Sequence, residues 1–427
     1  MAEVTTRRGF LRTSAAAGAG LWLGARTARA ARNAAGEELD IGVVGVDGRG
    51  AANLAAVSGE NIVALCDVDE HRLAQAASRF AGAKTYHDYR RMLDAHELDA
   101  VVVSTPDHTH AAATLAALRA GSHVYCEKPL TRTVADARLV AETAREAGLV
   151  TQMGTQIHAE PNYRRVVELV RSGTIGAVRE VHVLCAKSWG GSAAPTGSHA
   201  IPEHLHWDLW LGPSAEVAYN PAYHPANWRR YWAFGGGTLT DMACHYMDLP
   251  FWALDLRHPL SVEAEGPQVS EHTAPRWLVV RYRFPGPVDG EDLALTWWDG
   301  GRRPEELLAE KGLASWRNGV LFIGDGGWLM ADYTRHELGG AEAFESPAPF
   351  LPASVGHHAE WIAACKEGGP TTCNFTYSGR LTEAVLLGAV AYRSGERLDW
   401  DAERLEARGC PAAAAFLRRE VREGWGL

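Results

Sequence analysis

The chain has 427 residues, of which 46% are hydrophobic, so it can bury a sizeable core and, by the usual domain size, fold as two or three domains. Lysine and arginine total 42 against 52 aspartate and glutamate, which gives a formal net charge of -10. This composition excludes a short disulfide scaffold, a disordered tail and a protein whose basic surface attracts nucleic acid.

Residues 1–30 resemble a twin-arginine signal peptide. The pair Arg7-Arg8 precedes a short, weakly apolar stretch from Ser14 to Leu23, and Ala28-Arg29-Ala30 supplies small residues for cleavage before Ala31. The resemblance predicts that the twin-arginine translocase carries the folded protein to the periplasm or otherwise out of the cytoplasm. A disordered basic N-terminus is the alternative. The apolar stretch is too short for stable membrane insertion.

The spacing of cysteines and histidines gives no sign of disulfides or metal ligation. The seven cysteines form no C-x-x-C pair, and several lie in apolar or glycine-rich runs that are typical of buried positions. The 18 histidines are scattered, and the adjacent His357 and His358 are interpreted as a chance pair or a loop feature. We expect no disulfide framework and no metal.

Residues 38–155 alternate short β-rich runs with amphipathic helical runs. Strands separated by helices of this length must be parallel, because such crossovers cannot form hairpins. The pattern predicts an α/β domain with a doubly wound parallel sheet of the Rossmann type. The expected strands are Asp40–Gly45, Ile62–Asp67, Ala100–Ser104, His123–Cys126 and Leu149–Met153, and the expected helices include Asp69–Phe80, His110–Ala120 and Val134–Ala147.

The turn after the first strand has the glycine pattern of a dinucleotide site. It contains Gly45, Gly48, Arg49 and Gly50, and Asp67 ends the next strand. Glycines let the backbone approach a pyrophosphate at a helix N-terminus, while the acid accepts hydrogen bonds from the adenosine ribose hydroxyls. The pattern favours NAD over NADP, because Asp67 would repel the 2′-phosphate of NADP.

Two considerations count against this site. An ordinary βα turn can carry similar glycines, and Asp47 occupies the second glycine position of the pattern. A carboxylate within about 5 Å of a phosphate costs on the order of 3 kcal/mol at an effective dielectric constant near 20. The affinity for the cofactor therefore depends on where the Asp47 side chain turns.

Four further motifs follow along the chain. The first two lie at the carboxyl ends of predicted strands, where open α/β sheets bind ligands. The last places an acid and a histidine at i, i+4 on one face of a predicted helix. The motifs are Thr105-Pro106 with His110, Glu127-Lys128-Pro129, Gln156, and Asp241 with His245.

With these motifs in this order, the chain resembles the Gfo/Idh/MocA family of glucose-fructose oxidoreductase, inositol dehydrogenase and rhizopine-catabolism proteins, over nearly all of its length after residue 30. The resemblance implies an N-terminal nicotinamide-binding domain, residues 38–155, and a C-terminal substrate-binding and oligomerisation domain, residues 156–427. It also implies catalytic roles for Lys128, Asp241 and His245. The residues implied near the nicotinamide ribose are Thr105, Pro106, His110 and Glu127, with Gln156 as a further cofactor contact.

The chemistry of alcohol oxidation suits these residue types. It requires a hydride acceptor near the carbon and a base for the hydroxyl proton. Lys128, beside a nicotinamide cation, is expected to lose its proton more readily than a surface lysine, and His245 is the other candidate base. Taken alone, a lysine before a proline is usually a solvated turn, and a histidine four residues after an aspartate is usually a surface or capping pair.

The second half predicts the strands of one sheet. The resemblance implies an α/β domain with a large open, mainly antiparallel sheet that packs against a partner subunit in a dimer or tetramer. A helix is expected over Pro161–Gly173, and the final stretches Gly379–Arg393 and Arg404–Gly424 are expected to be helical. The expected strands are Val178–Lys187, Trp277–Phe284, Asp292–Trp298, Val320–Gly324 and Trp328–Asp332.

Several of the 15 tryptophans cluster shortly before the Asp241 motif. Aromatic faces beside arginine and histidine suit a sugar ring, because they stack on its C–H face while polar groups bind its hydroxyls. We expect Trp207, His224, Trp228 and Arg229 to form a wall of the substrate site. Core packing is the alternative for each tryptophan.

These observations predict an exported, NAD-dependent dehydrogenase that transfers a hydride between nicotinamide and a CH–OH carbon of a sugar, glycoside or polyol. One alternative is a glycosidase that uses NAD for transient oxidation and elimination. The acetylgalactosaminidase branch of such enzymes generally lacks the lysine found here as Lys128. The other alternative is a catalytically idle sugar-binding relative, against which Lys128, Asp241 and His245 count.

Overall fold

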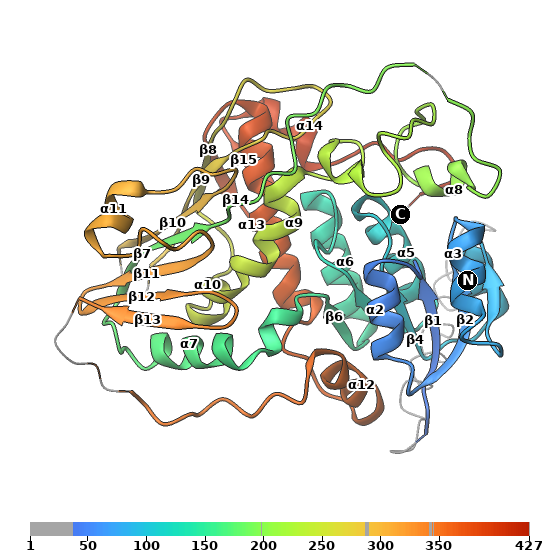
Figure 1. Cartoon of the computed structure of the whole chain (residues 1–427), viewed down its shortest axis with the longest axis horizontal. Coiled ribbons are helices and arrows are strands. Elements are labelled where there is room, and N and C mark those ends of the chain that lie inside the picture. The colour runs from blue at the N-terminus through green and yellow to red at the C-terminus, as the bar shows by residue number, and fades with distance from the viewer. Residues whose placement is uncertain (1–36, 198, 287–289, 341–343, 345, 427) are drawn as a thin grey trace, which may run out of the picture.

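The computed structural model describes residues 37–426 except 198, 287–289, 341–343 and 345, so the predicted signal peptide lies outside the described residues. Two sheets dominate the molecule and lie at opposite ends of it, with long helices between them (Figure 1). The first sheet has six strands and the second has nine among the described residues. This arrangement confirms the predicted fold class.

The first sheet is parallel throughout and has the order β3-β2-β1-β4-β5-β6. Its central strands are covered by helices on both faces, and their residues are accordingly apolar and buried. The strands are β1 (Asp40–Val44), β2 (Asn61–Cys66), β3 (Lys84–Tyr86), β4 (Ala100–Val103), β5 (His123–Cys126) and β6 (Thr151–Met153).

Three of the five helices of this unit begin at side chains that cap them. The Asp69 side chain accepts hydrogen bonds from the backbone N–H groups of His71 and Arg72, and Thr133 accepts one from Asp136. Gly148 ends its helix in the left-handed conformation. The helices are α2 (Arg49–Ala56), α3 (Glu70–Ala77), α4 (Tyr89–Ala95), α5 (Asp107–Arg119) and α6 (Val134–Ala147).

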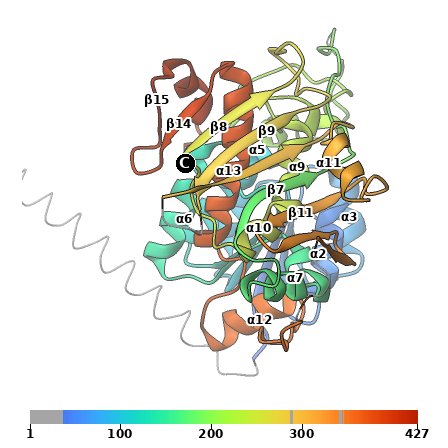
Figure 2. The same cartoon turned by 90° about the vertical axis from the view of Figure 1, so that its left-hand side faces the viewer.

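The second sheet has the order β13-β12-β11-β7-β10-β9-β8-β14-β15, and among its described pairings only β7 with β10 is parallel. Its long helices lie behind one face (Figure 2), whereas α11 (Glu305–Glu310) and the segment after it pack on part of the other face, where Leu308, Leu313 and Trp316 form a buried cluster with side chains of β7, β11 and β12. The strands are β7 (Val178–Leu184), β8 (Ser261–Glu265), β9 (Val279–Pro285), β10 (Asp292–Trp298), β11 (Gly319–Gly324), β12 (Gly327–Ala331), β13 (His336–Gly339), β14 (Leu398–Asp401) and β15 (Glu406–Arg408).

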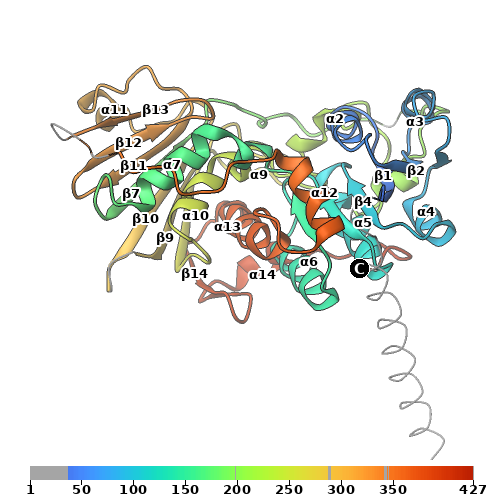
Figure 3. The same ribbon diagram turned by 90° about the horizontal axis from the view of Figure 1, so that it is seen from below.

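Helix α13 (Phe375–Ser394) joins the two units, because it packs against α6 on one side and against α9 and β8 on the other. Helix α12 (His357–Glu367) returns to the first unit, where Trp361 is fully buried against the core of β1 (Figure 3). The other helices are η1 (Gln156–Ala159), α7 (Pro161–Arg171), α8 (Trp207–Leu211), η2 (Asn227–Arg230), α9 (Gly237–Tyr246), α10 (Asp248–Ala253), α11 (Glu305–Glu310), η3 (Pro411–Ala413) and α14 (Ala414–Leu417).

The structure contains elements that the sequence analysis did not predict, and one predicted helix is wrong. The unpredicted elements of the first sheet and its helices are β3, which is only three residues long and lies at the edge of the sheet, and α4; elsewhere they include the strands β8, β13 and β14 and the helix α12. The helix expected over Arg404–Gly424 is wrong: β15 pairs with β14, and Gly409 and Pro411 interrupt the segment before the short α14.

All seven cysteines are free and buried. The protein interior therefore accommodates them as small apolar side chains. Within the described residues, no helix combines the length and the hydropathy that a membrane crossing requires.

Candidate active site

The glycine-rich turn lies between β1 and α2, and its geometry explains why glycines stand there. A Cβ atom on Gly50 would lie 2.1 Å from the carbonyl oxygen of Gly45, and one on Gly45 would lie 2.6 Å from the carbonyl oxygen of Ser104. Gly48 has a φ of +56°, and nothing lies within 4 Å of the position that its Cβ would take. The backbone at Gly48 is thus open to a ligand at the N-terminus of α2, where Arg49 is also exposed.

Asp67 follows β2 and faces this turn. Its two carboxylate oxygens accept hydrogen bonds from the backbone N–H groups of Val46 and Asp69, both at 3.0 Å. Burial raises the pKa of Asp67 above its usual value, although these backbone donors act in the opposite direction. Each oxygen keeps a second lone pair for a ribose hydroxyl.

The negative charge of the Asp47 carboxylate is balanced by Arg72 of α3. Its carboxylate lies 3.4 Å from the Arg72 guanidinium, and the Asp47 side chain is 45% exposed. With the open Gly48 backbone and the position of Asp67, this pairing leaves a turn whose residues fit an NAD molecule. The pyrophosphate would lie over Gly48 and the adenosine ribose at Asp67.

Lys128 and Asp241 form an ion pair between the two units. The Lys128 Nζ atom lies 2.7 Å from the Asp241 Oδ1 atom and donates a second hydrogen bond of 2.8 Å to the Asp241 backbone carbonyl. The Arg229 Nε atom donates to the same Oδ1 atom at 3.0 Å. Lys128 and Asp241 side chains are each only 12% exposed, so the structure brings these predicted residues together in a largely buried centre.

Burial and the neighbouring charges lower the pKa values of both Asp241 and His245 in this centre. Burial opposes ionisation of Asp241, but Lys128 and Arg229 outweigh it and lower the pKa of Asp241 to about 2. Burial, with Lys128 nearby, lowers the pKa of His245 to about 3. His245 is therefore a neutral ring at neutral pH, and its Nδ1 atom is buried without a hydrogen-bond partner.

Asp107 is a residue of this centre that the sequence analysis did not single out. It begins α5 and is 4% exposed. Burial raises the pKa of Asp107 to about 7, with Arg229 and Lys128 opposing the rise and Asp241 adding to it. Two acids with pKa values about 2 and about 7 thus share two cations. The signal that could have found Asp107 is its place directly after Thr105-Pro106, at the carboxyl end of β4.

A cavity of about 330 Å³ adjoins the centre and is lined in part by Asp107, Pro129 and Thr240. Arg132 and Arg393 also line it. Its volume lies at the lower end of the range for small-molecule sites, and its lining offers both charged and aromatic groups.

Glu127 connects the predicted motifs through hydrogen bonds. Its Oε1 atom accepts one from Asn53 of α2 at 3.0 Å and one from Gln156 at 2.8 Å. The Asn53 Oδ1 atom in turn lies 3.0 Å from the Nε2 atom of His358 on α12. Sequence reasoning missed Asn53 and assigned no role to His358, because neither belongs to a motif and α12 reaches this place only through the tertiary fold.

His110 lies inside the protein rather than at the surface of the turn. Its two ring nitrogens lie 2.7 Å from the carbonyl oxygens of Thr105 and Pro129, and the residue is 1% exposed. Burial lowers the pKa of His110 to about 4. The ring lies between the Thr105-Pro106 segment, which precedes α5, and the loop that carries Lys128, and as a neutral ring it donates a hydrogen bond to one of the two carbonyls. The Thr105 hydroxyl is buried without a partner.

Of the four residues expected to form a substrate wall, only Arg229 reaches the centre, where its guanidinium also lies over the Trp228 ring. Trp207 and Trp228 are 6% and 5% exposed and belong to one aromatic cluster, in which Trp207 stacks on Trp210. The His224 ring lies edge-on to Trp210, with 6.0 Å between ring centroids, and burial lowers the pKa of His224 to about 4.

A dinucleotide-binding turn, a buried lysine–aspartate pair at the adjoining strand ends and a second unit built on an open sheet define the nicotinamide-dependent oxidoreductases of two-domain α/β type. Residues 39–155 match the NAD-binding Rossmann fold of the Gfo/Idh/MocA oxidoreductase family, and residues 163–298 match the C-terminal α/β domain of that family. The chain belongs to the Gfo/Idh/MocA family.

Curated relatives of the chain include several inositol dehydrogenases. Inositol 2-dehydrogenase 2 of Saccharopolyspora erythraea is 38% identical over 195 residues, which cover 43% of this chain and 57% of that protein. Inositol 2-dehydrogenase of Salmonella typhimurium is 33% identical over 177 residues, covering 40% of this chain and 51% of that protein. The chain thus spans little more than half the length of these relatives.

Solved structures share the fold over most of the chain. GenD2 from gentamicin A biosynthesis, in complex with NAD, has a TM-score of 0.61 and 21% identity, with coverage of 86% of this chain and 98% of that one. Levoglucosan dehydrogenase, in complex with NADH and L-sorbose, has a TM-score of 0.60 and 18% identity, with coverage of 85% and 99%. These likenesses extend the fold assignment to both units.

Proposed function

We propose that the protein is an NAD-dependent oxidoreductase that acts on a CH–OH carbon of a sugar, glycoside or polyol. The observation that carries the proposal is the arrangement of Lys128. Two of the three donors of its ammonium group bind Asp241, which leaves one donor for a substrate oxygen. A lysine fixed in this way can exchange a proton with a hydroxyl or carbonyl oxygen in a set position.

The neighbouring residues position Lys128, bind the substrate and hold a proton. Asp241, ionised by its two cations, holds the Lys128 side chain in place. The neutral His245 ring, which is partly exposed, can form a hydrogen bond with a substrate hydroxyl. NAD, when bound, supplies the hydride acceptor. Asp107, with its pKa about 7, can store or release a proton next to Lys128 at neutral pH.

A polyhydroxylated substrate is supported by the relatives and by the cavity. The curated relatives are named for inositol, and one structural neighbour holds L-sorbose. The polar groups around the adjoining cavity suit a ligand with many hydroxyls.

The test combines the untagged protein with NAD and a panel of polyols, aldoses and aryl glycosides. Formation of NADH with at least one polyol or sugar is the expected result. Release of the aglycone without net NADH would contradict the dehydrogenase and favour transient oxidation and elimination. Tight NAD binding without turnover of any panel member would favour an idle sugar-binding relative.

We also propose that the protein is exported by the twin-arginine route, on the strength of the Arg7-Arg8 pair and the cleavage sequence before Ala31. Replacing both arginines with lysine is expected to leave folded precursor in the cytoplasm. Fractionation of cells that express the two forms measures this, and unchanged export of the double variant would contradict it.

We further propose that the protein forms a dimer or tetramer through the face of the nine-stranded sheet that lies opposite α13. Residues Arg281 and Arg283 of β9 are exposed there, alternating with buried neighbours. Light scattering of the purified protein is expected to give a mass of two or four chains. Charge reversal at these two arginines should shift it toward one chain.

A further inference from the structure

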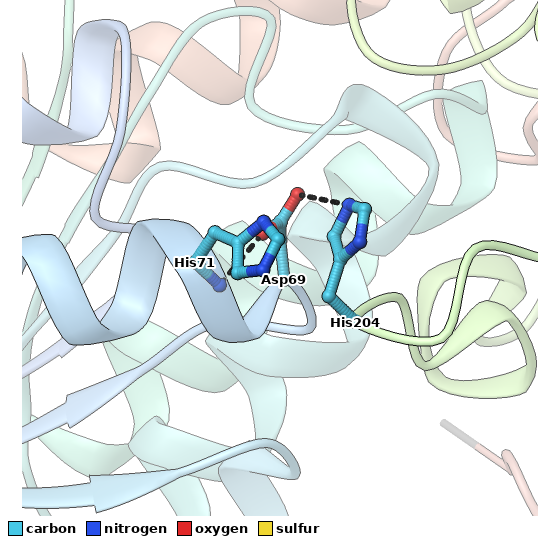
Figure 4. Close-up of side chains that lie close together, drawn as sticks. All are labelled: Asp69, His71 and His204. Carbon is cyan, nitrogen blue, oxygen red and sulfur yellow. Dashed lines mark hydrogen bonds and ion pairs between the residues drawn. The ribbon is translucent and has the colours of Figure 1, made fainter.

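Six side chains with metal-ligating atoms gather beside the adenosine end of the dinucleotide turn, and we call them the histidine patch. They come from the start of α3, from the residue after β3 and from the extended segment before α8. They form two groups, in each of which the ligand atoms lie within 4.8 Å of one another. The groups are Asp69, His71 and His204, shown in Figure 4, and Glu70, His87 and His206.

Backbone hydrogen bonds fix this arrangement. The Glu70 N–H donates to the His204 carbonyl, and the His206 N–H donates to the Val68 carbonyl, both at 2.9 Å. Leu205 between them forms a β-bridge with Asp69. Because alternate residues of an extended segment share one face, His204 and His206 both face the α3 side.

The second group already has the spacing of a metal site. The His206 Nε2 atom lies 3.1 Å from the Glu70 Oε1 atom, which is close to the separation of two ligand atoms each about 2.0–2.1 Å from a tetrahedral ion. The His87 Nδ1 atom lies 3.0 Å from the Asp67 carbonyl oxygen. Donation to a carbonyl leaves Nε2 as the free lone pair, as in most metal-ligating histidines.

The first group is less free to bind a cation. The Asp69 Oδ1 atom caps α3, and its Oδ2 atom lies 3.8 Å from the His204 Nε2 atom and 3.4 Å from Arg72. An incoming ion would compete with that guanidinium. Among the described residues, Glu70 forms an ion pair only with His206, so the second group is the better candidate for binding a cation.

In both groups the histidines are stacked, His71 on His204 at 4.1 Å and His87 on His206 at 4.2 Å between ring centroids. Stacked rings place their lone pairs in separate planes, so binding requires rotation of one ring in each pair. The side chains have room for it, because His71 and Glu70 are exposed and the other histidines are half-buried.

We propose that the histidine patch binds divalent transition-metal ions, first at Glu70, His87 and His206, with water completing the coordination. Two imidazoles and one carboxylate form a donor set typical of Zn²⁺. The ion ties the segment before α8 to the start of α3 and to the residue after β3. The site lies away from Lys128 and takes no part in the proposed reaction, so it stands or falls independently of that reaction.

The test uses untagged protein treated with a chelator and then dialysed, with ZnCl₂ as the probe. Calorimetry is expected to show one tight binding event with a dissociation constant in the micromolar range or below. Addition of ZnCl₂ should also raise the melting temperature. Co²⁺ in place of Zn²⁺ should give a visible absorption band of a low-coordinate site.

Variants separate the patch from nonspecific binding. His206→Ala and His87→Ala should each weaken the tight event by at least about tenfold and abolish the rise in melting temperature. His272→Ala, which removes an exposed histidine outside the patch, is the matched control and should bind as the wild type does. Circular dichroism of each metal-free variant checks its fold.

Three results would overturn the proposal. They are an absence of Zn²⁺ binding by the wild type at 100-fold excess over protein, equal weakening by His272→Ala, and wild-type affinity in both His206→Ala and His87→Ala. A second, weaker event that His204→Ala removes would assign the Asp69 group as an additional site.

Discussion

The proposed catalytic centre and the histidine patch both lie at the carboxyl edge of the Rossmann sheet, and both receive side chains from residues 204–245. They differ in how their charges are balanced. At the centre, the largely buried Lys128 and the partly exposed Arg229 are both paired with Asp241. At the patch, imidazole rings and carboxylates lie partly in solvent, with Arg72 at its rim.

This difference in charge balance indicates which kind of ligand each site can bind. Buried, internally paired charges hold a proton donor at a fixed point, which suits a reaction on a neutral polyol. Clustered lone pairs at the surface suit a cation that arrives from solvent. The following substitutions test the contrast, beginning with the largest expected effect.

Lys128→Ala should lower the rate of hydride transfer by about 10²–10⁴, the usual contribution of a positioned acid or base, while NAD binding and folding persist. Single-turnover kinetics with a deuterated substrate measure the step. Lys366→Ala removes a lysine that is also paired with a carboxylate, Glu60, and is the control. Equal rates in the Lys128 variant and the wild type would contradict the role of Lys128.

Asp241→Asn should lower the free energy of unfolding by on the order of 3 kcal/mol, because it removes the carboxylate that pairs with Lys128 in a largely buried place. At the patch, Asp69→Asn should cost less than about 1 kcal/mol, because asparagine caps a helix as well as aspartate does. Urea unfolding compares the two. Equal losses would contradict the difference between a carboxylate that pairs with a buried lysine and one that caps a helix.

His245→Gln should reduce the pH dependence of stability. In the folded protein the pKa of His245 is about 3, below its unfolded value near 6.5, so the unfolded chain binds the proton first. This group's contribution is therefore complete above pH 6.5 and is lost as the pH falls toward 3. The variant should lower the slope of unfolding free energy against pH by about 1.4 kcal/mol per unit near pH 5. An unchanged slope would contradict a buried neutral ring.

Asp67→Ala should narrow the preference for NAD over NADP by about tenfold, since it removes a charged hydrogen-bond acceptor and a charge that repels the 2′-phosphate. Asp47→Ala should change NAD affinity by less than about threefold, because its carboxylate is half-exposed and paired with Arg72. Fluorescence titration measures both variants. A larger loss of NAD affinity in Asp47→Ala than in Asp67→Ala would contradict the assignment of Asp67 as the residue that binds the ribose.

Much of the candidate site could be predicted from sequence because its residues follow strands. Asp67 stands directly after β2 and Lys128 stands two residues after β5, and parallel strands bring their carboxyl ends to one edge. Aromatic clustering was a weaker guide. Trp207 and Arg229 are only 22 positions apart in the sequence, yet one fills a small core and the other reaches Asp241.

Sequence by itself determined the two-unit α/β architecture, the glycine turn and the family, because local periodicity and short motifs encode them. Only the tertiary structure decided that Asp107 shares the cations of Asp241, that His358 of α12 reaches Asn53, and that the salt partner of Asp47 is Arg72. It also gathered the histidines of the patch. His87 and His206 are far apart in the chain and meet because backbone hydrogen bonds set residues 204–206 beside residues 68–70, a pairing that no local pattern specifies.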